Sequence, residues 1–321
     1  MESIRAIDLF CGGGGSSWGA QNAGVRIAAG FDSWEVAGKI YQDNFPRTKF
    51  FLGRVEDHKP SPLKRRLGRI DLILASPECT NHSPAKGKAP RCELSRATAF
   101  QVVRYAEAFQ PRWILIENVV SMRNWTRYGE LIACLIELGY SCSEHILDSA
   151  DFGVPQSRRR LFVVCDRDAD PSVGPPASSS SPRTVADILC PNGEYAFTQL
   201  RSPNRAQATI ERALRALEVI GPQEPFLIVY YGSDHAGGWQ PISKPLRTIT
   251  TLDRFAYVRP HEGGHIMRML QPEELKLAMG WPKRFRIMHG TRRERIKIIG
   301  NAVCPPVMQA VVSALVRKVS S

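Results

Sequence analysis

Short runs of apolar residues alternate with segments of helical periodicity along the first half of the chain. The apolar runs cover residues 4–10, 25–31, 70–75 and 112–116, and the helical segments cover 16–22, 34–44 and 95–109. Runs that are apolar throughout are typical of strands buried on both faces of a sheet. Their alternation with helices predicts an α/β fold with a mostly parallel sheet covered by helices on both faces.

The pattern changes after about residue 170. The segment PSVGPPASSSSP at 171–182 has the composition of a linker, and residues 183–265 are rich in turn-forming residues. This change predicts a second, smaller and irregular domain. The remaining predicted elements are a helix at 128–139, strands at 140–147 and 161–165, and helices at 205–219, 271–279 and 305–319.

A glycine turn follows the first predicted strand. Asp8 lies within the strand predicted at 4–10, four glycines occupy 12–15, and Asp32 ends the second strand. Glycines let the backbone approach a ligand closely, and an acid at the end of the second strand can bind ribose hydroxyls. The pattern indicates a nucleotide-like cofactor, for which S-adenosylmethionine fits as well as a dinucleotide. A glycine-rich connection without function is the alternative.

Chemically active side chains follow or precede three of the other strands. Cys79 comes just after the run 70–75, Glu117 closes the next run, and Arg158 and Arg160 precede the strand at 161–165. Ligands bind at the carboxyl edge of a parallel sheet, so Cys79 is a candidate nucleophile. A carboxylate such as Glu117 is costly at the end of an apolar strand unless it is hydrogen-bonded or protonated. Each residue taken alone has a structural alternative. Cys79 is then a packing residue, Glu117 a helix-capping acid, and the segment with Arg158 and Arg160 a solvated basic turn.

Composition narrows the class of protein. The 321 residues include 43 Lys and Arg and 31 Asp and Glu, which gives a net charge of +12, and 43% of the residues are apolar. These values suit a globular protein with a polyanionic partner. The eight cysteines have no zinc-site spacing, so no metal is expected. The sequence predicts neither a membrane span nor a secretory signal, and we expect a reduced, cytoplasmic chain.

Six blocks together resemble the DNA (cytosine-5) methyltransferase family, in the order in which that family has its motifs. The blocks are DLFCGGGG (8–15), SPEC (76–79), ENV (117–119), GVPQSRRRLFVV (153–164), RMLQPEELKLAMGWPKRF (268–285) and GNAVCPP (300–306). Residues 184–265 match little, and this is where the family has its target-recognition domain. The resemblance therefore implies a Rossmann-like methyltransferase fold with a small recognition domain, and S-adenosyl-L-methionine as the cofactor.

The resemblance also implies the reaction and its catalytic residues. A methyl group is transferred to C5 of a cytosine that is flipped out of double-stranded DNA at a specific sequence, through a covalent bond between Cys79 and C6. Glu117 matches the residue that hydrogen-bonds N3 of the base, and burial would favour its protonated form. Arg160 matches the residue that contacts O2, with Arg158 as its supporting partner. By the same matching, the cofactor-binding residues are Phe10, Gly12, Gly14, Asp32, Asn301 and Val303.

Further expectations concern DNA and the domains. The polar, basic segment 83–91 is interpreted as a loop that closes over DNA, although a solvated surface loop is the alternative. The expected DNA-binding residues are Lys86, Lys88 and Arg91 in that segment, and Arg201, Trp239 and Arg247 in the recognition segment. The expected catalytic domain is 1–183, completed by 298–321, and the expected recognition domain is 184–297. We expect the chain to be a monomer.

The sequence departs from the family pattern at three places. Glu78 and Thr80 flank Cys79 where the family has proline and glutamine, and Arg54 occupies the place of an acid that contacts adenine, for which Glu56 or Asp57 can substitute. An RNA cytosine-5 methyltransferase on the same scaffold is the main alternative. An inactive DNA-binding descendant is disfavoured because Cys79, Glu117 and Arg160 are all present, and a nicotinamide oxidoreductase has only the glycine turn in its favour.

Overall fold

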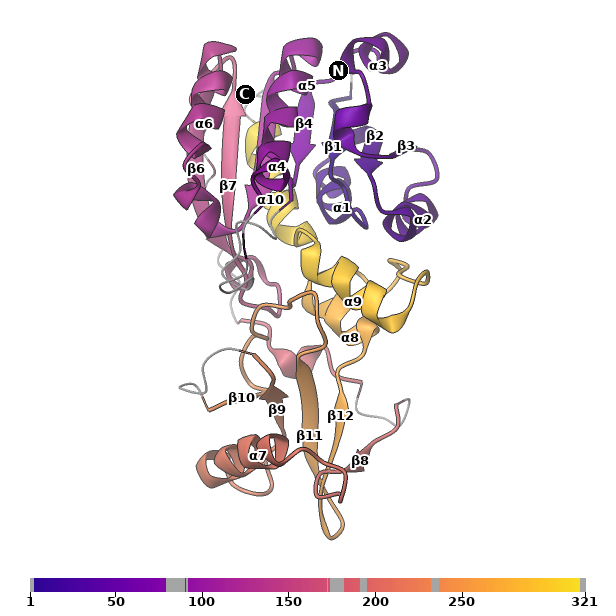
Figure 1. Ribbon diagram of the computed structural model, residues 1–321, viewed down its shortest axis with the longest axis vertical. Coiled ribbons are helices and arrows are strands. Elements are labelled where there is room, and N and C mark those ends of the chain that lie inside the picture. Colours follow the sequence, from indigo (N-terminus) through magenta and orange to yellow (C-terminus); the bar gives the residue numbers. More distant parts are fainter. Residues whose placement is uncertain are drawn as a thin grey trace.

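The computed structural model describes residues 3–78, 90, 92–171, 173, 182–190, 195–231 and 237–317. Cys79, Thr80, Lys86, Lys88 and Arg91, about which the sequence makes predictions, lie outside the described residues. The described chain forms an upper lobe on a large sheet and a lower lobe on a small sheet (Figure 1).

The upper lobe has a seven-stranded sheet in the order β3-β2-β1-β4-β5-β7-β6. Its strands are β1 (Arg5–Leu9), β2 (Arg26–Asp32), β3 (Lys49–Leu52), β4 (Leu72–Ala75), β5 (Trp113–Asn118), β6 (Ser141–Asp148) and β7 (Arg159–Asp166). Neighbouring strands are parallel except that β7 runs antiparallel to both β5 and β6. The mostly parallel α/β sheet expected from the apolar runs is confirmed.

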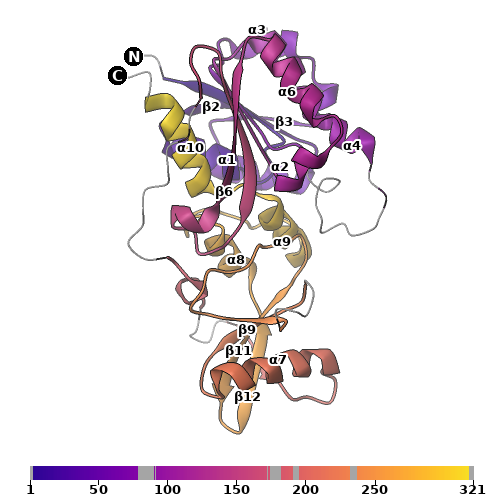
Figure 2. The ribbon, with the colours of Figure 1, turned by 90° about the vertical axis from the view of Figure 1, so that its left-hand side faces the viewer.

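Helices cover both faces of this sheet, as Figure 2 shows with the sheet nearly edge-on. They are α1 (Gly15–Asn22), α2 (Glu35–Asn44), α3 (Pro60–Leu67), α4 (Glu93–Ala97), α5 (Gln101–Phe109), α6 (Tyr128–Glu137) and α10 (Pro305–Arg317). One core contains side chains of α1, α2 and α10, and the other contains side chains of α3, α5 and α6. Residues of one strand alternate between these cores, because successive side chains of a strand point to opposite faces.

The C-terminal helix returns to the beginning of the chain. A Cβ atom at Gly19 of α1 would lie 2.5 Å from the carbonyl oxygen of Pro305, the first residue of α10. No side chain larger than glycine fits at that contact. The two helices therefore pack backbone to backbone, and α10 completes the layer that α1 begins.

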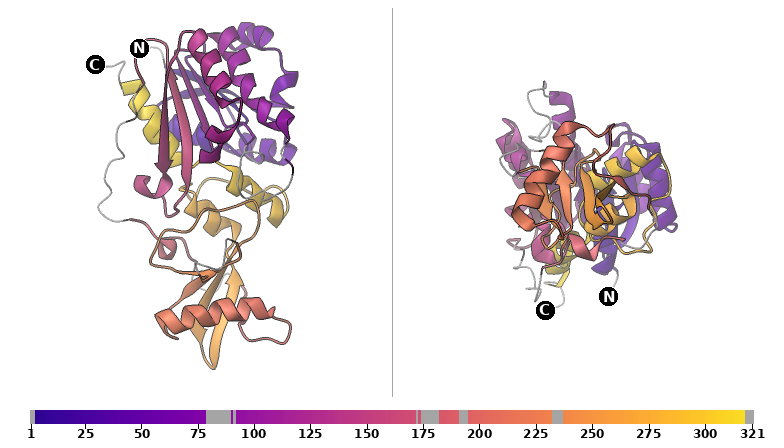
Figure 3. Two further views of the ribbon diagram at one scale, coloured as in Figure 1. Left: turned by 60° about the vertical axis from the view of Figure 1, so that its left-hand side comes forward. Right: turned by 90° about the horizontal axis from the view of Figure 1, so that it is seen from below.

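The lower lobe is more regular than its sequence suggests. It has a five-stranded antiparallel sheet in the order β10-β9-β11-β12-β8. The strands are β8 (Thr198–Gln199), β9 (Phe226–Val229), β10 (Trp239–Pro241), β11 (Phe255–His261) and β12 (Gly264–Met269). Helix α7 (Gln207–Ile220) covers one face, with Ala213 and Ala216 packed against Phe226 and Ile228 (Figure 3). These strands were not expected because most are only two to four residues long.

Two helices lie between the lobes in Figure 1, α8 (Pro272–Ala278) and α9 (Arg292–Asn301). A buried ion pair anchors α8: Arg268 at the end of β12 makes two hydrogen bonds of 2.6 and 2.7 Å to Glu274. Glu274 also accepts hydrogen bonds from the backbone N–H groups of Cys190 and Gln271. The start of α8 is thereby fixed to the small sheet.

Most predicted elements of the upper lobe are present, with ends that differ by a few residues. The segment predicted as one helix over 95–109 forms α4, a 3-10 turn (Thr98–Phe100) and α5. The sequence interpretation missed β3, α3 and α9. Further 3-10 turns lie at Val55–Asp57, Val120–Asn124, Ser149–Phe152 and Val185–Asp187.

The stretch Arg292–Val316, which spans α9 and most of α10, is apolar enough to cross a membrane by length and composition. Its most apolar window is 67% buried inside the protein, as in the core helix of a folded domain.

Candidate active site

The glycine turn after β1 has a backbone shape that requires small residues. Gly12 and Gly14 have positive φ angles of 51° and 97°, and Phe10 has the rare value of 60° for a residue with a side chain. Two hydrogen bonds fix the turn to β2: Gly12 N–H donates to Oδ2 of Asp32 at 2.8 Å, and Cys11 N–H donates to the carbonyl of Phe31 at 3.0 Å. Asp32 thus organises the turn and, as shown below, also lines the cavity beside it.

The C-terminal segment closes against the same turn. A Cβ atom at Gly15 would lie 2.2 Å from the carbonyl oxygen of Val303, and one at Gly13 would lie 2.8 Å from Ile298. The run of glycines is therefore needed for contact with the segment 298–303 as well as for the turn. This contact brings the two ends of the described chain together at one site.

A cavity of about 440 Å³ lies at this junction, at the carboxyl edge of the parallel strands. Its lining includes Phe10, Gly12, Asp32, Glu117, Asn301 and Val303, all predicted as site residues, together with Trp34, Arg54, Glu56, Ser76, Pro77, Glu78 and Lys297. The volume lies in the usual range for cofactor sites. Gly14 is not part of the lining; it caps α1 and packs near Phe45 and Tyr41.

The buried carboxyl group of Asp8 joins β1 to the start of α1, on either side of the glycine turn. Oδ2 of Asp8 accepts hydrogen bonds from the hydroxyls of Ser16 at 2.5 Å and Ser17 at 2.6 Å, while Oδ1 is buried without a partner. Ser17 also shares a 2.8 Å hydrogen bond with the hydroxyl of Tyr41. Burial raises the pKa of Asp8 from 3.8 to about 7, against the lowering effect of the two hydroxyls, and nearby Asp32 raises it further. The sequence interpretation gave Asp8 no role of its own.

Glu117 and Arg160 meet at the ends of β5 and β7. Glu117 is buried, at 6% exposure, and its Oε1 lies 3.4 Å from Nε of Arg160. Burial raises the pKa of Glu117, while the positive charges of Arg160 and Arg158 partly oppose the rise. A neutral carboxyl group at the edge of the cavity can donate a hydrogen bond, which a carboxylate cannot.

Asn118 links the end of β5 to the segment that follows β4. Its side-chain amide donates a 3.0 Å hydrogen bond to the carbonyl of Pro77, two residues before Cys79 in the chain. Its Oδ1 accepts from the N–H of Val119 at 2.8 Å. Asn118 is 2% exposed, so this bond holds the end of β4 beside Glu117. Asn118 is the middle residue of the ENV block, so the motif draws attention to it. The motif does not indicate that its hydrogen-bond partner is Pro77.

Arg158, expected as the supporting partner of Arg160, lies behind the cavity. It does not line the cavity; it is 4% exposed and donates to the carbonyls of Ile249, Gly300 and Ala302 at 3.1, 2.8 and 3.1 Å. These carbonyls belong to the lower lobe and to the segment that carries Asn301 and Val303. Arg158 therefore joins three parts of the fold behind the cavity.

Two of the residues that depart from the family pattern, Glu78 and Arg54, line the cavity, whereas Thr80 lies outside the described residues. Glu78 accepts a hydrogen bond from the hydroxyl of Ser95 in α4. Arg54 pairs with Glu56 at 2.8 Å, and both line the cavity, whereas Asp57 does not. Of the two acids considered as substitutes for the adenine-contacting acid, only Glu56 is in the lining.

The lower lobe brings two of the predicted DNA-binding residues together. Arg247 donates from its guanidinium to the carbonyl of Trp239 at 3.1 Å, and both side chains are half-buried. Arg201 is exposed and lies beyond the end of β8. Gly237, two residues before Trp239, has a φ of 76° and no room for a Cβ beside the indole ring.

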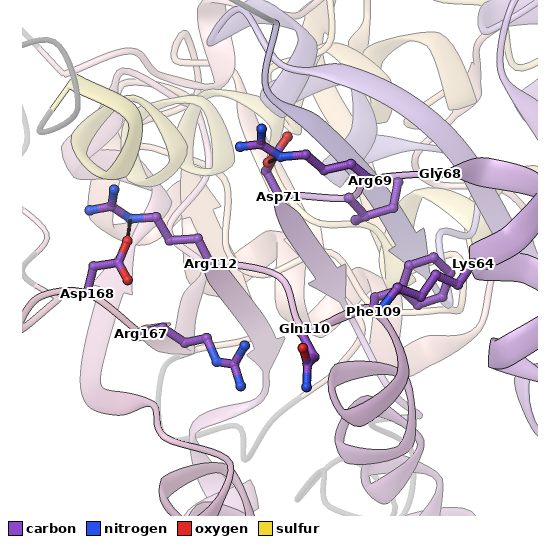
Figure 4. A pocket seen from close by; sticks show the side chains of 10 residues that line it. Lys64, Gly68, Arg69, Asp71, Phe109, Gln110, Arg112, Arg167 and Asp168 are labelled. Carbon is purple, nitrogen blue, oxygen red and sulfur yellow. Dashed lines mark hydrogen bonds and ion pairs between the residues drawn. The ribbon is translucent and has the colours of Figure 1, made fainter.

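A second cavity, of about 580 Å³, lies at the opposite, amino edge of the strands (Figure 4). Two of its three arginines pair with acids: Arg69 with Asp71 at 2.6 Å and Arg112 with Asp168 at 3.1 Å. It contains none of the predicted site residues. The candidate active site is therefore the cavity at the carboxyl edge, where ligands of parallel α/β sheets bind.

The sheet order, the antiparallel seventh strand and the glycine turn against Asp32 define a Rossmann-like methyltransferase fold. The model of the C-5 cytosine-specific DNA methylase family matches residues 4–317, and the chain belongs to this family. It is a DNA (cytosine-5)-methyltransferase with S-adenosyl-L-methionine as its cofactor, as the ordered motifs predicted.

Curated relatives agree with this assignment, and solved structures agree with the fold. The type II methyltransferase M.HindV of Haemophilus influenzae is 29% identical over 98% of this chain and 96% of its own length. The type II methyltransferase M.HgiDI of Herpetosiphon aurantiacus is 30% identical over 94% and 90%. In fold, the chain is similar to a putative DNA modification methyltransferase encoded within an Escherichia coli prophage, with a TM-score of 0.72 at 18% identity, covering 99% of this chain and all of that one. It is also similar to the Dnmt2 methyltransferase of S. pombe, with a TM-score of 0.68 at 16% identity over the whole of both chains.

Proposed function

We propose that the chain methylates C5 of a cytosine flipped out of double-stranded DNA at a specific sequence, with Cys79 as the nucleophile. The observation that carries this proposal is the contact between the half-buried Arg160 and the buried Glu117, which lines the cavity. Glu78, in the lining of that cavity, directly precedes Cys79 in the sequence. A DNA-binding module without catalytic activity has no use for a buried carboxyl group with a raised pKa at this edge.

The chemistry of cytosine explains why these residues are needed. C5 of the base is too weak a nucleophile to react with a methyl donor unaided. Addition of the Cys79 thiolate to C6 breaks the aromatic conjugation and makes C5 electron-rich, while negative charge moves toward N3 and O2. After methylation, removal of the C5 proton lets the thiolate leave and restores the aromatic ring.

Glu117 and Arg160 respond to the charge that develops on the base. The neutral Glu117 carboxyl donates its proton toward N3, and burial keeps it neutral at a higher pH than an exposed glutamate. Arg160 donates hydrogen bonds to O2. Arg158 is a positioning residue rather than a catalytic one, because its guanidinium bonds to backbone carbonyls behind the cavity.

The residues of the cavity fit the cofactor. The narrow glycine turn leaves room for a ligand above Gly12, where a Cβ atom would meet nothing within 4 Å, and Asp32 offers carboxylate oxygens for ribose hydroxyls. Trp34 provides an aromatic surface beside it, and Asn301 and Val303 close the other wall. Bound there, S-adenosylmethionine supplies an electrophilic methyl group. The negative charges of Asp32 and Glu56 suit its positive charge and its amino groups.

We further propose that residues 1–183 with 298–321 form the catalytic domain and that 184–297 form the target-recognition domain. Arg201, Trp239 and Arg247 would contact DNA from the recognition domain, and Lys86, Lys88 and Arg91 from the segment after the nucleophile. The net charge of +12 favours DNA and makes binding depend on salt. The chain would act as a monomer inside the cell, as the modification enzyme of a type II restriction system like its relatives.

The decisive experiment combines product mapping with trapping of the covalent intermediate. Plasmid DNA methylated by the enzyme is read by bisulfite or nanopore sequencing, with tRNA as a parallel substrate. DNA carrying 5-fluorocytosine at the mapped site should then form an adduct that resists denaturation, and Cys79→Ala should lose this adduct while Cys134→Ser keeps it. An adduct that persists in Cys79→Ala would overturn the assignment of the nucleophile. Methylation of tRNA alone would overturn the DNA substrate.

A further inference from the structure

Two cysteines outside the active site face each other across neighbouring strands. Cys142 of β6 and Cys165 of β7 are directly paired in the antiparallel register, and their sulfur atoms lie 2.8 Å apart. Both are free thiols. Directly paired residues of antiparallel strands have Cα atoms roughly 4.5–5.5 Å apart, inside the range that disulfides span. A covalent bond between these sulfurs therefore needs no rearrangement of the backbone.

The two thiols differ in exposure and in acidity. Cys142 is half-buried, whereas Cys165 is buried between β6 and the central strand β5, where it faces Ile114. A hydrogen bond joins the two thiols, and it lowers the pKa of Cys142. The same hydrogen bond and burial raise the pKa of Cys165, and the hydroxyls of Tyr128 and Tyr140 lie near it. Cys142 is thus the thiol that ionises first and the one that a small molecule can reach.

We propose that Cys142 and Cys165 are a thiol–disulfide modification site, oxidised to an intramolecular disulfide by low-molecular-weight disulfides such as oxidised glutathione. The Cys142 thiolate attacks one sulfur of the oxidant, forms a mixed disulfide and releases one thiolate. Cys165 then loses its proton and attacks the sulfur of Cys142, which releases the second thiolate. Two protein thiols are oxidised and one small disulfide is reduced to two thiols, so atoms and electrons balance.

The position of the pair determines what oxidation does to the enzyme. The disulfide closes a loop between residues 23 positions apart, and this loop contains Arg158 and Arg160. Cys165 points to the same face of β7 as Leu161 and Val163, whereas Phe162 and Val164 belong to the core on the other face. Arg160 shares the face of Phe162 and Val164, because side chains alternate along a strand. Oxidation should therefore stabilise the edge of the sheet without displacing Arg160.

The test uses the full-length enzyme incubated with oxidised glutathione and digested without reduction. We expect a peptide pair joined through Cys142 and Cys165 and lighter by two hydrogens than the free peptides. The melting temperature should rise by several degrees and return to its original value with dithiothreitol. Cys165→Ser should stop at a glutathione adduct on Cys142, and Cys142→Ser should form neither product at this pair. Cys134→Ser, a half-buried cysteine of α6, is the matched control and should behave as the native enzyme.

Two results would overturn the proposal. One is glutathione that remains on Cys142 in the native enzyme, which would mean that Cys165 does not resolve the mixed disulfide. The other is a linked pair whose formation lowers the melting temperature, which would mean that the bond distorts the sheet.

Discussion

Nε of Arg160 lies 3.4 Å from Oε1 of Glu117, so the start of β7 and the end of β5 are coupled through one charged contact. Because Glu117 is buried, the balance between its neutral and charged forms depends on this arginine. The two residues are 43 positions apart in the sequence, and only the antiparallel insertion of β7 beside β5 brings them together. The catalytic proposal can be tested at this contact.

Replacing Glu117 by glutamine should lower kcat by about 10²- to 10⁴-fold, which is the usual contribution of a general acid. The amide still donates a hydrogen bond to N3 but cannot supply a proton, so the KM for DNA should change little. Steady-state methylation with tritiated cofactor measures both. Glu130→Gln, an exposed glutamate of α6, is the control and should match the native enzyme. Native kcat in Glu117→Gln would exclude the carboxyl from proton transfer.

The pH profile should reflect the coupling between Glu117 and Arg160. The neutral carboxyl is the active form, so kcat/KM should fall as pH rises through the raised pKa of Glu117. Arg160 holds that pKa down, and Arg160→Gln should therefore move the alkaline limb to higher pH while lowering the maximum rate. A limb that stays in place, or moves to lower pH, would show that another group controls it.

Asp8 should make stability depend on pH in a direction unusual for a carboxyl group. Its pKa is about 7 in the folded protein and near 3.8 when unfolded, so the folded state holds the proton more tightly. Its contribution to stability is complete below pH 3.8 and is lost as pH rises through about 7, by a few kcal/mol in all.

The Asp8→Asn variant isolates this effect, because asparagine keeps an oxygen acceptor for Ser16 and Ser17 and cannot ionise. Urea denaturation between pH 5 and 8 should show the native enzyme losing stability relative to Asp8→Asn. Parallel curves for the two proteins would mean that Asp8 does not titrate in this range.

Arg158→Lys should weaken binding of S-adenosylhomocysteine, the product form of the cofactor, about tenfold. Lysine cannot bond three carbonyls at once, and Gly300 and Ala302 flank a residue of the cavity wall. Hydrogen bonds from a charged group contribute about 1.5–3 kcal/mol, which sets the size of the effect. Isothermal titration calorimetry measures it, with Arg159→Lys, an exposed arginine at the start of β7, as the control. Equal affinities in both variants would contradict the positioning role.

Glu274→Gln should destabilise the enzyme by about 3–5 kcal/mol, because Arg268 would be left as an uncompensated charge with a side chain only 2% exposed. The variant should lower the urea midpoint and affect the small sheet and α8 together. Glu130→Gln breaks an exposed ion pair with Arg127 and should leave the midpoint unchanged. A small effect in Glu274→Gln would mean that water replaces the lost partner.

Much of the upper lobe follows from local patterns in the sequence. The apolar runs at 4–10, 25–31, 70–75 and 112–116 became β1, β2, β4 and β5, because a strand buried on both faces must be apolar along its whole length. The lower lobe did not follow in the same way. Its strands are short, its core is small, and strand pairing joins segments that are far apart in sequence. The hydrophobic periodicity and the lengths of the apolar runs therefore did not predict the five-stranded sheet.

By itself, the sequence determined the class of fold and the family, because six motifs in a fixed order are specific even though each one alone is weak. Only the tertiary structure decided that Arg158 bonds three carbonyls behind the cavity, that Asn118 holds Pro77, and that Cys142 faces Cys165. The physical reason is the same in each case. A motif states which side chain is present, whereas its partner is set by strand order, register and burial, which depend on the whole chain at once.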